Sequence, residues 1–174
     1  MRSIFVILLF LVGTIILIAG CTENASTTSV SSANSVRTYN IGDTASDGIS
    51  SVTVNSMKFI SYKDMGKWQS SYEQKFPGGQ ILLVKISVKN LQRDNKINAP
   101  FGVVGDNSGQ TYDSQADEMM FSPYFPNTTK FDESNILPGE TRVGNEGFVI
   151  PITATGLTYR YSMNSGQIAV FNLK

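Results

Sequence analysis

The sequence predicts an all-β protein, an antiparallel β-sandwich of seven to eight strands. After residue 38 the apolar residues recur mainly with a period of two, which is typical of strands with one buried face. Clusters of Gly, Pro, Asn and Asp separate these segments at short intervals, as turns require. No segment after Cys21 shows a long helical period. Together these features favour two packed sheets over a helical bundle.

Each strand follows from its own pattern. Leu82, Val84, Ile86 and Val88 alternate with more polar residues and give the clearest strand. In the second expected strand the alternation slips by one residue after Val54, which predicts a β-bulge. In chain order, the strands are expected at residues 39–41, 49–59, 82–88, 101–104, 110–112, 141–150, 157–163 and 168–173.

Three connections carry specific turn chemistry. Asp106-Asn107-Ser108-Gly109 predicts a hairpin turn. Pro138 and Gly139 occupy the central positions that a type II turn prefers. Asn164-Ser165-Gly166 is expected to turn the chain into the last strand.

Two stretches depart from the strand pattern. In residues 62–80, Met65, Trp68, Tyr72 and Phe76 follow one another at helical spacing, and Pro77 comes next. A short helix or a structured loop is expected there. Residues 114–136 form a long loop rich in Met and aromatic residues, and loops of this length are often functional.

The N-terminus indicates export and a lipid anchor. Residues 4–20 carry no charge, and they end in Ile18-Ala19-Gly20 followed by Cys21, the chain's one cysteine. This arrangement looks like a lipobox, the cleavage and lipidation signal of prokaryotic lipoproteins. The predicted organisation is a signal peptide over 1–20, a Ser/Thr-rich flexible tether over 21–38 and a sandwich domain over 39–174. An uncleaved membrane anchor over the same apolar run is the alternative, and both predictions place the domain outside the cytoplasm.

Composition excludes several function classes. The chain has 14 Lys and Arg against 14 Asp and Glu, so it lacks the cationic excess of a nucleic-acid binder. It has no histidine, and its one thiol is the predicted lipid site, so the usual general base and nucleophile are missing. Asp113, Asp117 and Glu118 do not have calcium-loop spacing. We therefore expect no catalytic residues, no metal and no cofactor.

Five aromatic residues form the candidate partner-binding site. These are Trp68, Tyr72, Phe76, Tyr124 and Phe125, all in the two stretches that depart from the strand pattern. Aromatic side chains anchor many protein interfaces and also stack on sugars, so a protein or a glycan is the expected partner. The alternative is that these rings pack on one another and close one end of the sandwich.

Two further modification sites are sequence-level candidates. Asn24-Ala25-Ser26 and Asn127-Thr128-Thr129 match the N-glycosylation sequon. Such tripeptides also occur by chance, so glycosylation at Asn24 and Asn127 is a hypothesis.

Several local patterns occur together in a fixed order behind the lipobox. They are Tyr39 to Asp43, Val52 to Ser56, Gly79 to Asn90, Asp106 to Tyr112, Leu137 to Thr141 and Gly147 to Pro151. In this order the chain resembles the telokin-like, immunoglobulin-like lipoprotein domain family of unknown function, which is similar to the mycobacterial immunoprotective extracellular antigen. The resemblance covers about residues 38–174 and implies a small immunoglobulin-like sandwich on the cell surface, with no catalytic residues to transfer.

The sequence thus predicts a membrane-anchored extracytoplasmic lipoprotein that presents a non-catalytic binding or adhesion domain. One alternative is a structural or accessory subunit of an envelope or transporter complex. Another is a hydrolase that uses Ser and Lys or paired carboxylates. Fold alone does not choose among them, because sandwiches serve many roles.

Overall fold

The structure is a computed structural model that describes residues 36–115 and 129–173. By its internal contacts the chain divides into two units, Met1–Ser32 and Ala33–Lys174, and the described residues all belong to the second. In chain order its elements are β1 (Arg37–Asn40), β2 (Thr44–Ser46), β3 (Ser50–Ile60), η1 (Tyr62–Trp68), α1 (Gln69–Lys75), β4 (Gly79–Asn90), β5 (Val103–Gly105), β6 (Thr111–Asp113), β7 (Thr141–Pro151), β8 (Thr158–Ser162) and β9 (Ile168–Asn172).

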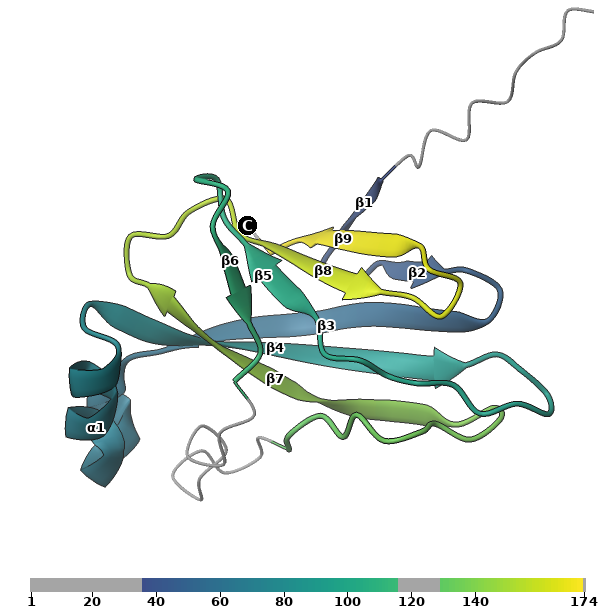
Figure 1. Cartoon of the computed structure of the whole chain (residues 1–174), viewed down its shortest axis with the longest axis horizontal. Coiled ribbons are helices and arrows are strands. Elements are labelled where there is room, and N and C mark those ends of the chain that lie inside the picture. The colour runs from purple at the N-terminus through teal and green to yellow at the C-terminus, as the bar shows by residue number, and fades with distance from the viewer. Residues whose placement is uncertain (1–35, 116–128, 174) are drawn as a thin grey trace, which may run out of the picture. The chain divides into compact units, whose positions relative to one another are not determined.

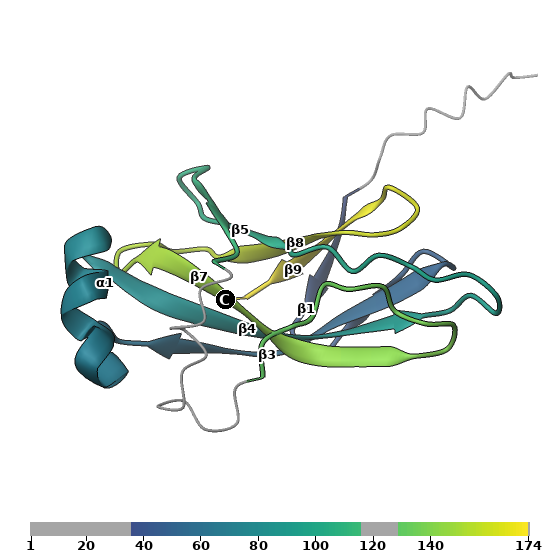
Figure 2. The same cartoon turned by 60° about the horizontal axis from the view of Figure 1, so that its bottom comes forward.

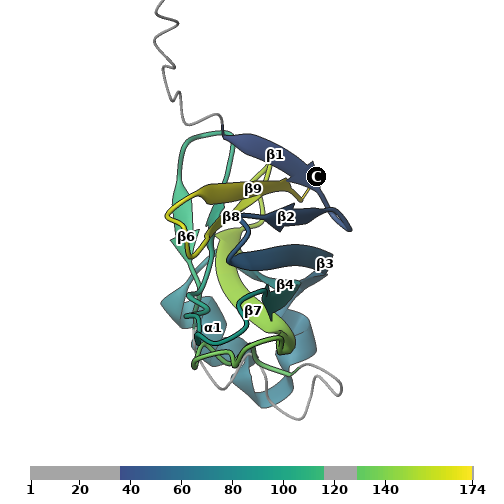
Figure 3. The ribbon, with the colours of Figure 1, turned by 90° about the vertical axis from the view of Figure 1, so that its right-hand side faces the viewer.

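The strands form two sheets that pack face to face (Figures 1 and 3). One sheet has the order β1-β9-β8-β5-β6, and the other has the order β2-β3-β4-β7. The predicted β-sandwich is confirmed. The described residues hold nine strands rather than seven or eight, because the sequence did not predict the three-residue strand β2. The pairing of β1 with β9 is parallel, while the other strand pairs are antiparallel.

The core lies between the two sheets, and β4 is its central strand. Leu82, Val84, Ile86 and Val88 are fully buried, as their alternation predicts. Burial of each such side chain stabilises the folded state by about 1.5–3 kcal/mol relative to leaving it exposed. The facing sheet contributes three large buried rings, Tyr159, Tyr161 and Phe171.

A second, smaller core covers the outer face of the four-stranded sheet at one end. Ile81 and Leu83 of β4 lie on the face opposite to Leu82, and they are also buried. They pack with Ile60 and with residues of η1 and α1, which lie at that end of the sandwich (Figure 2). The helical spacing in residues 62–80 therefore does predict a short helix, and this helix explains why β4 is apolar on both faces near its start.

The predicted irregularities and turns are in place. The register of β3 against β4 shifts between Val54 and Ser56, which is the expected bulge. The Glu140 N–H donates to the Leu137 carbonyl at 3.0 Å, and Gly139 has a φ of 73°, so this turn is of the predicted kind. Strand β1 starts at Arg37, two residues before the expected start of the sandwich domain at Tyr39.

Candidate functional site

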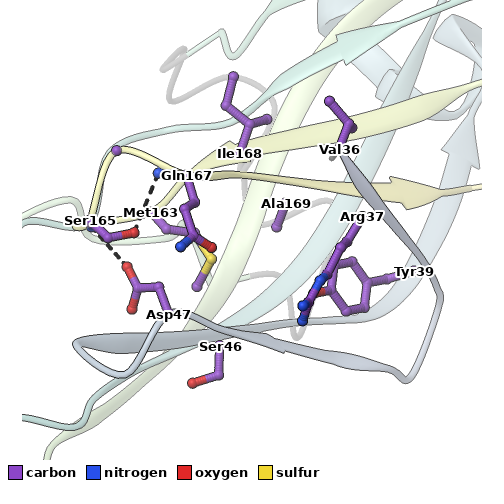
Figure 4. Close-up of a pocket in the computed structure, with 11 residues that line it drawn as sticks. Val36, Arg37, Tyr39, Ser46, Asp47, Met163, Ser165, Gln167, Ile168 and Ala169 are labelled. Atoms are coloured by element: carbon purple, nitrogen blue, oxygen red, sulfur yellow. Dashed lines mark hydrogen bonds between the residues drawn. The ribbon is translucent and has the colours of Figure 1, made fainter. Parts of the chain in front are cut away.

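A pocket of about 530 Å³ is lined by the side chains drawn in Figure 4. Strands β1 and β2, which contribute to it, lie at the end of the sandwich opposite α1 (Figure 1). The lining residues of the pocket come from β1, from the end of β2 and from the β8–β9 hairpin. They are Val36, Arg37, Tyr39, Ser46, Asp47, Met163, Ser165, Gly166, Gln167, Ile168 and Ala169. The sequence offered no motif for this site, because its residues are distant along the chain.

The pocket exists because the chain changes sheets between β1 and β2. Residues 41–43 make a tight turn in which the Asp43 N–H donates to the Asn40 carbonyl at 3.0 Å. The Asp43 carboxylate accepts in return from the Asn40 N–H at 2.8 Å. Gly42 has a φ of 94°, a conformation that L side chains rarely adopt. After this turn β2 joins the opposite sheet, so β1 and β2 are the edge strands on one side of the sandwich.

Asp47 ties two turns together at the side of the pocket. Its carboxylate accepts from the backbone N–H groups of Ile49 at 2.9 Å and of Ser50 at 2.6 Å. It also accepts from the Ser165 N–H at 2.8 Å, which links it to the β8–β9 hairpin (Figure 4). Burial acts to raise the pKa of Asp47, but these hydrogen bonds outweigh it and the pKa is lowered. Asp47 is therefore ionised and holds the two turns together. Its carboxylate oxygens can accept few further hydrogen bonds.

Arg37 is the cation of the pocket. It lies two residues before Tyr39 on β1, so the two side chains share one face of the strand. Tyr39 packs against Phe171 of the core, with the ring centroids 5.3 Å apart, and that face therefore points between the sheets. Within residues 36–115 and 129–173 the Arg37 guanidinium has no ion pair or hydrogen bond. Arg37 is thus available to an anionic group, in a site where Asp47 is already satisfied.

Two of the side chains that line the pocket are aliphatic and exposed. Val36 is 62% exposed and Ile168 is 51% exposed, and both line the pocket. Exposed aliphatic side chains beside a concave site are typical of recognition surfaces when they gather around a polar group. The arrangement suits a ligand that has both apolar and anionic parts.

Glu146 is a second chemically unusual group, and sequence reasoning missed it. It lies on β7, is 1% exposed and faces the core. Its carboxylate accepts from the Gly102 N–H at 2.9 Å and from the Tyr159 hydroxyl at 3.0 Å. Burial raises its pKa from an ordinary 4.5 to about 7, although these two hydrogen bonds act in the opposite direction. The period-two alternation of side chains along β7 places residue 146 on the core-facing side of the strand. This alternation is the sequence feature that could have identified Glu146 as buried.

The groups nearest to the Glu146 carboxylate include two core tyrosines. The Tyr161 hydroxyl nearby is buried and has no hydrogen-bond partner among the described residues. Tyr159 is fully buried and holds its proton, because burial raises its pKa further above an already high value. Glu146 is not among the residues that line the pocket and it is buried in the core, so we expect its protonation state to change the stability of the domain.

The predicted aromatic site is partly core. Tyr72 is 2% exposed and packs against Tyr62, with ring centroids 5.6 Å apart, and against Phe76 at 6.1 Å. Trp68 and Phe76 are half-buried at the edge of the same cluster. Lys67 lies over the Trp68 ring at 5.1 Å, and Lys75 lies over the Phe76 ring at the same distance. The structure therefore brings three of the five aromatic residues together, with Tyr72 inside and the other two at the surface.

We expect Tyr72→Ala to lower the free energy of unfolding by about 3–5 kcal/mol, because it removes a buried ring from the smaller core. Urea unfolding of the chain Ala33–Lys174 measures this change. Ser71→Ala is the matched control, since Ser71 is exposed on the same helix, and its effect should stay within about 0.5 kcal/mol. Equal stabilities of the two variants would show that the ring of Tyr72 does not support the fold.

The remaining sequence-predicted positions are not described by the structure. Cys21, Asn24, Tyr124, Phe125 and Asn127 all fall within residues 1–35 or 116–128. Lipidation, glycosylation and the second half of the aromatic site therefore stay predictions.

The described part of the chain holds no group of three or more His, Cys, Asp or Glu side chains that could ligate a metal ion. None of its helices is both long and apolar enough to cross a bilayer.

The fold and the site together define a small β-sandwich domain with an open pocket at its sheet edges. The family described as "Domain of unknown function (DUF4352)" matches residues 39–169, and the chain belongs to this family. None of the curated proteins matches the chain.

Solved structures share the fold at low sequence identity. The yjhA protein from Bacillus subtilis superimposes with a TM-score of 0.55 and 13% identity, over 78% of this chain and 99% of its own. The secreted protein MPT63 from Mycobacterium tuberculosis gives a TM-score of 0.51 and 14% identity, over 78% and 96%. An uncharacterised beta-sandwich protein from Clostridium difficile gives a TM-score of 0.50 and 16% identity, over 79% of this chain and 94% of its own. The resemblance to the mycobacterial antigen is thus confirmed at the level of the fold.

Proposed function

We propose that the protein is an extracytoplasmic lipoprotein, anchored through acyl chains on Cys21, whose sandwich binds a ligand without transforming it. The observation that carries the binding role is the pocket between β1 and β2, which is concave, open and about 530 Å³ in volume. This size is within the range of small-ligand and peptide sites. Its polar groups are a free guanidinium, a satisfied carboxylate, hydroxyls and an amide, which suit recognition more than bond cleavage.

The anchor is supported by the N-terminal sequence. The run that ends in Ile18-Ala19-Gly20-Cys21 has the charge and length pattern of a lipoprotein leader. The mature chain is close to neutral, so electrostatic attraction to anionic lipids contributes little and the acyl chains must supply the affinity. Two acyl chains hold a protein stably at a membrane, whereas one gives marginal binding.

We expect the chain, expressed in a bacterium that processes lipoproteins, to lose residues 1–20 and to gain acyl mass on Cys21. Intact-mass spectrometry of the membrane fraction measures both changes. Cys21→Ser should abolish the acyl mass and the processing, while the matched variant Ser26→Ala should behave like the wild type. Recovery of the wild-type chain in the cytosol, with its leader and a free thiol, would contradict the proposal.

A further inference from the structure

We propose that the pocket between β1 and β2 binds an extended acidic peptide strand, whose backbone pairs with the free edge of β1 and whose carboxylate pairs with Arg37. This inference rests on the proposed binding function and names the class of ligand. It stands on three observations: an unpaired strand edge, an unpaired cation on the face beside it, and exposed aliphatic side chains in the pocket lining.

The strand edge is the first observation. Within the part of the chain that the structure describes, β1 pairs on one side with β9 and has no strand on its other side. The Asn40 N–H and carbonyl are both bonded to Asp43, so the unpaired edge groups of β1 belong to the residues before Asn40. β2 is likewise paired only with β3 and forms the edge of the second sheet on the same side of the sandwich (Figure 3). Edge strands present unpaired N–H and C=O groups that an extended peptide can use, and alternate side chains of that peptide then enter neighbouring pockets.

The charge of the pocket selects the peptide. Arg37 and Asp47 are the two charged lining residues. Asp47 already accepts four hydrogen bonds from Ile49, Ser50 and Ser165, so it offers little to an incoming donor. Arg37 has five N–H donors and no partner in the described structure, and its planar guanidinium matches a carboxylate in a two-point hydrogen bond. A glutamate or aspartate on the pocket-facing side of the strand would satisfy it.

The apolar lining residues select the neighbours of that acidic residue. Val36, Ile168 and Met163 line the pocket, and the first two are more than half exposed. Val36 directly precedes Arg37, and Ile168 directly precedes Ala169, the residue that pairs with Arg37, so both aliphatic side chains lie on the strand face opposite to Arg37 (Figure 4). In an added strand, the residues directly before and after the acidic residue also fall on that opposite face, so we expect apolar residues at those two positions.

Arg37 has a competing interpretation. Inward-pointing charges on edge strands also prevent unwanted pairing between proteins, without binding any ligand. In that case the residue would oppose the addition of any strand, acidic or neutral. The two interpretations predict opposite effects of removing its charge, so one variant separates them.

The experiment uses the compact unit Ala33–Lys174 and three blocked hexapeptides. The first places a central glutamate on one face and a valine at each of the two adjacent positions on the other face, with threonine at the remaining positions. The second replaces the glutamate with glutamine, and the third keeps the glutamate but carries N-methyl groups on alternate backbone amides. Two-dimensional ¹⁵N NMR titration measures the dissociation constants and locates the shifted amides.

We expect the acidic peptide to shift amides of residues 36–40 and 165–169. The glutamine peptide should bind about tenfold more weakly, since a neutral amide cannot form the charge-assisted two-point hydrogen bond with Arg37. The N-methylated peptide should not bind, because it cannot pair with the strand edge. Arg37→Gln should lose the preference for glutamate, and Arg160→Gln, an exposed arginine on β8, should retain it.

Four results would overturn the inference. They are the absence of shifts at the pocket, equal binding of the N-methylated peptide, an unchanged preference in Arg37→Gln, and tighter binding of both peptides by Arg37→Gln. Arg37 is exposed, so its replacement should leave the spectrum of the free domain intact, and the same titration checks this. Failure here leaves the acylation of Cys21 and the binding of other ligands untouched. Cleavage of the peptide during the titration, seen by mass spectrometry, would instead contradict the non-catalytic function.

Discussion

Glu146→Gln should make the domain more stable at pH 8 and leave its stability at pH 5 nearly unchanged. In the folded chain this carboxyl is 1% exposed, and burial raises its pKa to about 7. Its partners are the Gly102 N–H and the Tyr159 hydroxyl, and Glu133 adds a like charge that also favours the protonated form. A glutamine can accept from the Gly102 N–H and stays neutral at every pH.

The sign follows from proton binding in the two states. In the unfolded chain Glu146 titrates near its ordinary 4.5, so between about pH 4.5 and 7 the folded state binds more protons than the unfolded state. The stability of the wild type therefore falls as pH rises through this window and levels off above pH 7. A difference of roughly 2.5 pKa units corresponds to about 3 kcal/mol.

Few other groups compete in this window. The chain has no histidine. Hydrogen bonds from Ser134 and from the Leu137 backbone lower the pKa values of Asp132 and Glu140, respectively, and hydrogen bonds also lower that of Asp47, so all three titrate at more acid pH. The pH profile between 5 and 8 should thus report mainly Glu146.

Urea unfolding at several pH values between 5 and 8 measures the effect on the chain Ala33–Lys174. Glu73→Gln is the matched control, because Glu73 is exposed on α1 and its replacement should leave the wild-type slope. A wild-type profile that is flat over this range would show that the buried carboxyl does not change its protonation state. A slope that persists in Glu146→Gln would assign the pH dependence to another group.

The sandwich follows from the sequence because its core strands alternate cleanly. Leu82, Val84, Ile86 and Val88 identify one buried face, and the slip after Val54 identifies the bulge. Short-range turn chemistry at Gly139 was equally readable. These features depend on neighbours two or three residues away, which a linear sequence records directly.

The pocket and Glu146 depend instead on long-range placement. The sequence assigns Arg37 to the tether, because the residues before it are polar. In the structure Arg37 begins a four-residue strand that is stabilised by pairing with β9. Tyr72 and Trp68 share one helical stripe, and only the packing of α1 on the sheet decides that Tyr72 is inside and Trp68 is at the edge. Glu146 is tolerated inside because Gly102 and Tyr159, which are distant in sequence, supply its donors.

Gly144→Ala should lower the free energy of unfolding by about 2–3 kcal/mol, because the new methyl group would collide with backbone rather than with a flexible side chain. In the structure Gly144 of β7 permits a close approach of residues 130–131: an added Cβ would lie 2.7 Å from the backbone nitrogen of Phe131 and 3.0 Å from the Lys130 carbonyl oxygen. The Phe131 N–H donates to the Asn145 carbonyl at 2.8 Å, so this segment is fixed against β7 next to Gly144.

Relief of this collision requires the backbone at Phe131 to move, and that movement would withdraw a fully buried ring from the core. Truncating the ring does not help, so Phe131→Ala should fail to rescue Gly144→Ala. Gly105→Ala is the matched control, since its added Cβ would meet its nearest heavy atom, Thr158 Oγ1, at an ordinary 3.4 Å. Its effect should stay within about 0.5 kcal/mol. Thermal unfolding of the three variants measures these differences, and equal stability of Gly144→Ala and Gly105→Ala would show that residues 130–131 can shift away from β7 at little cost.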